Sequence, residues 1–161
     1  MKHFISLFAL VASLFVASHV AAQTIAVTNA WVRATVQGQK ATGAFMTVTS
    51  KENAKLVAVS SPVASIVEIH EMKMEKDVMK MAALPNGLDL PAGKAVDLKP
   101  GSFHIMLMDL KLPLTKEVAV PLTLTFQDSA GKKSQQVLQV PVGVQPPSGQ
   151  VMNHQHGDHK H

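Results

Sequence analysis

The chain has 161 residues, a formal net charge of +4 and no cysteine. The absence of cysteine excludes thiolate zinc centres, blue-copper His/Cys sites, dithiol redox centres and cysteine nucleophiles. The lysines are scattered and only 4% of residues are aromatic, so the charge does not form the basic surface typical of nucleic-acid binding. No carboxylate pair and no nucleophile–base set stands out, and we therefore expect a protein that is not an enzyme.

The N-terminal segment has the pattern of a secretory signal peptide. Lys2 gives a positive start, residues 4–16 form an apolar run too short to span a bilayer, and Val20 and Ala22 occupy an A-x-A-like cleavage site. We expect cleavage after Ala22 and no membrane span in the mature form. The alternative is an uncleaved anchor, which the shortness of the apolar run disfavours. Gln23 follows the expected cut, so a lipid cannot be attached through a cysteine there.

Short strands separated by turn residues account for most of the expected domain, residues 23–144. Turn residues occur at 61–62, 85–87, 91–93 and 99–101, and residues 128–132 resemble a hairpin connection. No window shows a strong 3.6-residue period. This pattern favours an all-β antiparallel sandwich or barrel. The expected strands are residues 24–33, 43–50, 56–60, 66–72, 78–83, 102–110, 118–127 and 134–142.

Histidine and methionine are concentrated in two short segments, HEMKMEKDVMKM at 70–81 and FHIMLM at 103–108. Alternate residues of a strand share a face. In the second segment, residues 103, 105 and 107 therefore form an apolar stripe, whereas His104, Met106 and Met108 face the other way. One histidine and two methionines on the same strand face are an unusual combination for a surface that contacts only water.

The first segment can fold as a hairpin between residues 66–72 and 78–83. A turn centred between Glu75 and Lys76 would place His70 directly opposite Met81, with their Cβ atoms roughly 5 Å apart. The strand containing His104 and Met106 could then complete a cluster of two histidines and two methionines. Imidazole suits copper, and soft neutral thioethers favour Cu(I), whereas zinc would recruit thiolate or carboxylate ligands.

A simpler interpretation is that the methionines fill gaps in a core. We interpret Met46 in this way and expect four further methionines to line the cluster: Met72, Met74, Met79 and Met108. The histidines resist the same explanation, because all six that follow residue 22 lie in segments that also contain methionine.

These residues resemble the periplasmic copper chaperones of the PCuAC family. The family pattern is a histidine, ten residues, a methionine, about twenty-one residues and then His-x-Met. Here His70 precedes Met81 by that spacing, and residues 82–103 separate Met81 from His104 and Met106, one residue more than usual. The similarity extends to NAWVRAT, KATGAF, GLDLPAG and LKPGSFHIMLM, which together cover most of the domain.

The resemblance implies a cupredoxin-like, immunoglobulin-like antiparallel β-sandwich in the periplasm. It implies that Cu(I) is held by His70, Met81, His104 and Met106. It also implies delivery of copper to the CuA domain of cytochrome c oxidase subunit II, directly or through a Sco-type thioredoxin-like partner. A monomer is expected. The alternative is a structural or adhesive β-sandwich whose methionine cluster is core packing.

Residues 145–161 change character and form an expected flexible tail. The sequence PPSG is a linker, and it is followed by a His-rich tract, which commonly binds metals. We expect a second site for Cu(II) there; a tag remnant or a loose metal scavenger are the alternatives. The candidate tail ligands are Met152, His154, His156, His159 and His161.

Overall fold

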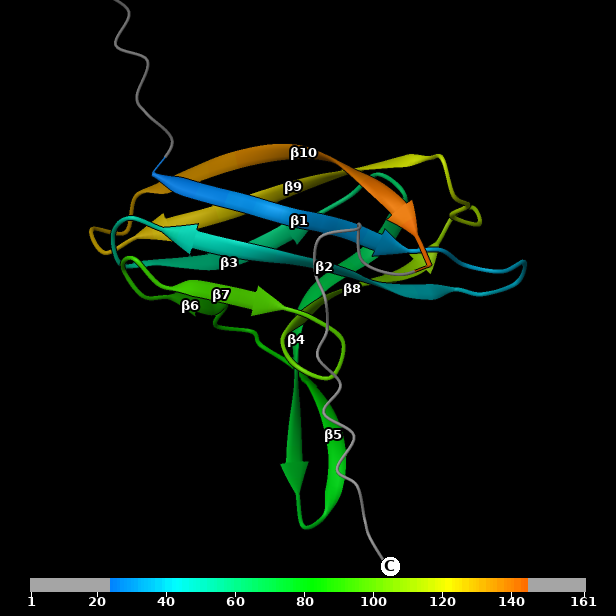
Figure 1. Ribbon diagram of the computed structural model, residues 1–161, viewed down its shortest axis with the longest axis horizontal. Helices are drawn as coiled ribbons and strands as arrows, with labels where there is room; N and C mark the ends of the chain where they lie inside the picture. The colour runs from blue at the N-terminus through cyan, green and yellow to red at the C-terminus, as the bar shows by residue number, and fades with distance from the viewer. Residues whose placement is uncertain (1–23, 145–161) are drawn as a thin grey trace, which may run out of the picture.

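The computed structural model describes residues 24–144, which form ten β-strands and no helix (Figure 1). Among these residues, therefore, no helix is long and apolar enough to cross a membrane. The strands are β1 (Ile25–Arg33), β2 (Ala41–Ser50), β3 (Ala54–Ser60), β4 (Ala64–Glu75), β5 (Val78–Ala83), β6 (Leu88–Leu90), β7 (Ala95–Leu98), β8 (His104–Leu110), β9 (Ala119–Asp128) and β10 (Lys133–Gly143).

The strands follow one path that folds into two facing layers. The order is β5-β4-β8-β2-β1-β10-β9-β3-β6, and β7 pairs with β2 beside β8. All pairings between two strands are antiparallel except the short parallel contact of β1 with β10, where Val32 faces Val142. This contact joins the layer containing β2, β4 and β8 to the layer containing β3, β6 and β9. The expected antiparallel β-sandwich is confirmed.

The core lies between the two layers and consists of aliphatic side chains with one phenylalanine. Alternation along β9 buries Leu122, Leu124 and Phe126 almost completely, and Ile105 and Leu107 of β8 are likewise inaccessible. The apolar stripe predicted for residues 103–108 thus faces the core, and its alternate residues lie on the outer face of the sheet. The prediction that Met46 is a core residue is also confirmed, since it is only 2% exposed.

Two short strands, β6 and β7, were not expected from the sequence. Each has three or four residues and is bounded by the predicted turns. Their alternation is too short to stand out from loop sequence. Tertiary pairing with β3 and β2 forms them.

The β4–β5 hairpin leaves the sandwich and projects into solvent (Figure 1). All six residues of β5 are exposed, whereas β4 buries Ile69 and His70 at its middle and ends with three exposed residues. The inner half of β4 pairs with β8, and the outer half pairs only with β5. The hairpin root is anchored by the Leu84 N–H, which donates to the Ile69 carbonyl over 2.8 Å.

The hairpin forms as predicted, but its expected register is wrong. Glu75 pairs with Val78, so the loop consists of Lys76 and Asp77, and both have positive φ angles of 49° and 63°. Two left-handed central residues characterise a type I′ turn, which matches the twist of the flanking strands. Asn-Gly is the usual signal for that turn, and the sequence lacks it.

The turn centre therefore lies one residue beyond the expected point. Each residue of β4 consequently pairs with a β5 residue two positions further along the chain than expected. His70 lies opposite Ala83, and Met81 lies opposite Met72. Because strand side chains alternate with a period of two, His70 and Met81 still share a face.

Candidate metal centre

The two histidines of the domain meet on the outer face of the sheet, where β4 and β8 run side by side. His70 and His104 are directly paired across these strands, and their ring centroids are 5.8 Å apart. Both are buried, at 7% and 6% exposure. The position lies at the root of the hairpin, so two segments distant in the sequence converge at one point.

The orientation of His104 is fixed by the backbone. Its Nδ1 lies 2.9 Å from the carbonyl oxygen of Ser102. A carbonyl only accepts, so Nδ1 carries the proton and, in the neutral ring, Nε2 carries a free lone pair. That Nε2 lies 3.3 Å from the sulfur of Met81. Two electron-pair donors from β5 and β8 therefore point at the same space.

His70 is held in the complementary way. Its Nε2 lies 2.8 Å from a carboxylate oxygen of Glu68, so in the neutral ring Nε2 donates and Nδ1 carries the lone pair. This Nδ1 is buried and has no hydrogen-bond partner. An unsatisfied buried nitrogen costs about 1–3 kcal/mol, and such an exception in a folded domain commonly marks a functional position.

Met106 follows His104 by two residues on β8 and therefore shares its face. Both line a partly open pocket of about 290 Å³, together with Met72 of β4. Met81 itself is half exposed, at 50%. The structure thus brings His70, Met81, His104 and Met106 to one region of the surface.

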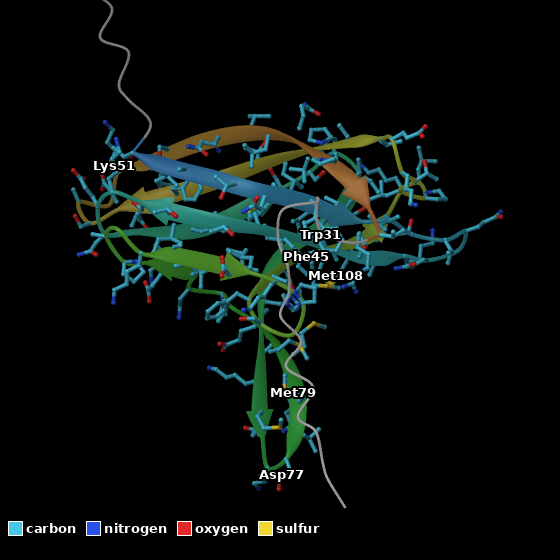
Figure 2. All side chains as sticks on the ribbon, viewed as in Figure 1. Trp31, Phe45, Lys51, Asp77, Met79 and Met108 are labelled. Carbon is cyan, nitrogen blue, oxygen red and sulfur yellow. The ribbon has the colours of Figure 1, made fainter. Side chains whose placement is uncertain are left out.

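An aromatic floor beside the site was not assigned any role from the sequence. The Phe45 ring lies 6.5 Å from the His104 ring and 4.7 Å from the Trp31 ring. The Arg33 guanidinium sits 5.2 Å above Phe45. Gly43 makes room for this stack, because a Cβ there would lie 2.7 Å from the Phe45 ring. Figure 2 labels Trp31 and Phe45 next to one another on the sandwich, above the projecting hairpin.

The Gly43–Phe45 spacing is the sequence signal for this floor. A glycine two residues before an aromatic on the same strand face leaves space for the ring to lie back along the strand. Trp31 and Phe45 are buried, yet they do not belong to the core between the layers. They therefore wall the outer-face site and exclude water from one side of His104.

The donor set is soft and neutral. Within residues 24–144, no group of three or more His, Cys, Asp or Glu side chains could hold a metal ion. The arrangement can offer two imidazole nitrogens and two or three thioether sulfurs, which together suit a soft monovalent ion.

The remaining predicted ligands lie outside the described residues. They are Met152, His154, His156, His159 and His161 of the tail. The signal peptide predicted at residues 1–22 also lies outside that range.

Comparison with known proteins identifies the family. The family model described as "Putative lipoprotein LpqE-like" matches residues 25–157. The chain belongs to the LpqE-like family. Two relatives of this LpqE-like protein are "Putative lipoprotein Lxx21020" from Leifsonia xyli, 34% identical over 68% of the chain, and "Uncharacterized protein RP573" from Rickettsia prowazekii, 31% identical over 76%. The chain spans 66% and 68% of the length of these relatives.

Solved structures share the fold of this LpqE-like protein. The apo PCuAC domain from PmoF1 superposes with a TM-score of 0.57 at 20% identity, covering 74% of this chain and 95% of that domain. DR1885 from Deinococcus radiodurans is similar in two solution structures. The apo form has 26% identity, a TM-score of 0.55 and coverage of 89% and 98%. The Cu(I) form has 28% identity, a TM-score of 0.54 and coverage of 78% and 82%.

Proposed function

We propose that this LpqE-like protein is an exported copper chaperone that carries Cu(I) on His70, Met81, His104 and Met106. The observation that carries this proposal is the approach of the Met81 sulfur to within 3.3 Å of the His104 Nε2. The ring proton of His104 is committed to the Ser102 carbonyl. Two lone pairs therefore face one another, and a cation between them would turn that contact into a favourable one.

The separation of these two atoms suits two ligands of one ion. Bonds of about 2.0 Å to nitrogen and 2.3 Å to sulfur, as in zinc centres, would separate the ligand atoms by roughly 3.5 Å at the tetrahedral angle. The buried Nδ1 of His70 supplies a further unpaired donor. Glu68 holds the other nitrogen of that ring, as carboxylates commonly do for metal-binding histidines.

The oxidation state follows from the donor chemistry. Thioethers and neutral imidazoles do not offset the charge of a divalent ion, and thioethers favour Cu(I) over zinc, calcium or magnesium. Thioethers also cannot form the disulfides that would inactivate thiolate ligands in an oxidising compartment. The solved Cu(I) form of DR1885, which has a similar fold, supports copper as the cargo.

A site for transfer must let an acceptor reach the metal. Met81 is half exposed on the hairpin, whereas His70 and His104 are buried. An acceptor's ligand could replace the Met81 thioether first while both imidazoles still hold the ion. This gradient of exposure suits a carrier and not an enzyme that retains its metal.

The proposed acceptor is the CuA domain of cytochrome c oxidase subunit II, or a Sco-type thioredoxin-like protein that loads it. The resemblance to periplasmic PCuAC chaperones supports this destination. The chain has no cysteine and cannot itself reduce the thiols of a CuA site, so a separate thiol-redox protein would accompany delivery. The His-rich tail is proposed to bind Cu(II), whose preference for nitrogen and oxygen ligands suits it.

Anaerobic titration of the reduced protein with Cu(I), in competition with a chromogenic chelator, tests the proposal. A chaperone binds one ion tightly at the four-donor site, and sulfur and nitrogen ligands appear in its X-ray absorption spectrum. A structural or adhesive β-sandwich would show no tight stoichiometric binding. Deleting the residues after Ser148 should remove Cu(II) uptake and leave tight Cu(I) binding unchanged.

A further inference from the structure

The projecting hairpin carries a row of methionines on one face. The register of β4 with β5 places Met74 opposite Met79 and Met72 opposite Met81. Alternate residues of each strand share a face, so these four residues form two stacked cross-strand pairs. We call Met72, Met74, Met79 and Met81 the methionine ladder. Its inner end is the sulfur that faces His104, and its outer end is next to the turn.

Core packing does not explain the ladder. Met74 is 65% exposed, Met79 is 45% exposed and Met81 is 50% exposed. Methionine normally appears in irregular core gaps, but none of the ladder residues belongs to the core cluster. Figure 2 shows Met79 on the projecting hairpin, well below the sandwich, with Asp77 at its tip.

The opposite face of the same hairpin has ordinary surface chemistry. Lys73 pairs with Lys80 across the strands, and each forms an ion pair with a glutamate, Glu71 and Glu75 respectively. Only one face therefore carries exposed thioethers. Exposed methionine is open to oxidation, so the presence of three exposed methionines on one face calls for a function in which sulfur is used.

We propose that Met74 and Met79 form a second, weaker Cu(I) site at the tip of the hairpin, from which the ladder passes the ion to the His104 site. The inference rests on the proposed function, because it takes the four-donor site as the destination. Cβ atoms of directly opposed residues lie about 4.5–5.5 Å apart, so two flexible thioethers can bind one ion between them. Such a two-sulfur site is weaker than one that includes two imidazoles.

Transfer along the ladder requires only ligand exchange. Successive pairs on one strand face are about 7 Å apart, a distance that the long methionine side chains can bridge. The bonds from copper to Met74 and Met79 break as bonds to Met72 and Met81 form. The bond to Met72 is then replaced by one to the Nε2 of His104. The ion remains Cu(I), and no electron or proton is transferred.

Met72 is the residue that connects the two sites. It lies opposite Met81 on the hairpin and also lines the pocket that contains His104 and Met106. Its backbone N–H donates to the Ser102 carbonyl over 3.3 Å, which holds the ladder against the strand end that positions His104. The path from tip to site is therefore continuous in the fold.

The experiment follows the methionine ε-methyl groups by ¹³C NMR during anaerobic Cu(I) titration of the whole protein. The first equivalent should shift the Met81 and Met106 signals, and further Cu(I) should shift Met74 and Met79. The variant Met74→Leu/Met79→Leu keeps apolar bulk but removes both sulfurs. It should lose the weaker binding event, retain the tight one and load more slowly from a Cu(I)–chelator complex. Met46→Leu, in the core between the layers, is the matched control and should behave as the wild type.

The outcomes separate the two proposals. If Met81 and Met106 shift but Met74 and Met79 never do, the ladder site is wrong and the chaperone proposal stands. If the double variant loads at the wild-type rate, the transfer step is overturned. If none of these methyl groups responds to Cu(I), both proposals fail. The wild-type titration decides the binding question even if the double variant does not fold.

Discussion

The sandwich and the projecting hairpin belong to one continuous sheet but differ completely in burial. Along β9, Leu122, Leu124 and Phe126 are at most 1% exposed, whereas no residue of β5 is buried. Stability in a protein is concentrated where apolar contacts are dense, and regions with few such contacts open at low free energy. The tightly packed core and the exposed methionines of the hairpin therefore lie in different regions, and the buried histidines lie at the boundary.

The largest expected effect comes from breaking the core. Phe126→Ala should lower the free energy of unfolding by about 3–5 kcal/mol, because a buried aromatic is replaced by a cavity. Urea denaturation measures the change. Val78→Ala on the hairpin is the matched control and should stay within about 0.5 kcal/mol, since Val78 is 58% exposed. Equal losses at both positions would show that the hairpin shares the stability of the core.

Removing donors at the boundary should separate binding from folding. His104→Ala combined with Met106→Ala removes two of the proposed ligands. Loss of a residue that only hydrogen-bonds to a metal ligand typically lowers metal affinity by about 10–100-fold, and Cu(I) affinity should fall by more than that here. Chelator competition measures the affinity, and circular dichroism checks that the β-sandwich persists. Retention of full affinity in a folded double variant would mean that the ligands have been misassigned.

A smaller effect is expected from the residue that orients His70. Glu68→Gln keeps the size of the side chain but removes the carboxylate that holds the ring Nε2–H. Cu(I) affinity should fall by about tenfold, with no comparable change in the urea midpoint. Glu75→Gln is the control, because Glu75 pairs with Lys80 on the hairpin and not with a histidine. Similar affinities for both variants would show that Glu68 has no positioning role.

The smallest expected effect is a gain in stability of the hairpin turn, which tests whether the hairpin unfolds separately from the sandwich. Lys76→Asn with Asp77→Gly installs the residues that type I′ turns prefer at positions with φ of 49° and 63°. The hairpin should gain about 0.5–1 kcal/mol from relief of left-handed strain. Hydrogen exchange should slow at β5 amides and remain the same at β9 amides. Slower exchange in both strands would mean that the two regions unfold together.

Much of the fold was predictable because the signals are local. The alternation in residues 103–108 placed Ile105 and Leu107 in the core and His104 and Met106 outside it, and the structure agrees. The hairpin register was not predictable, since Lys76 and Asp77 adopt a turn without its usual residues. The error shifted each partner by two and so left every side chain on the expected face.

The sequence indicated which residues would lie close together at the candidate site, but not what would surround them. Spacing and resemblance brought His70, Met81, His104 and Met106 together, and the structure places them in one region. The aromatic floor of Trp31 and Phe45 depends on the pairing of β1 with β2, a contact that no local pattern encodes. The position of Met72 in the pocket likewise depends on tertiary packing. The contact of Glu68 with His70 is local, because the two residues lie two apart on β4.

The carbonyl of Ser102 has a practical consequence for spectroscopy. It accepts the ring proton of His104 and the amide proton of Met72 at the same time. Two donors that share one oxygen compete for its electron density, so a change in the pull of the imidazole alters the bond to the amide. The Met72 amide resonance is therefore a built-in reporter, which senses events at the histidine without any label on the ring.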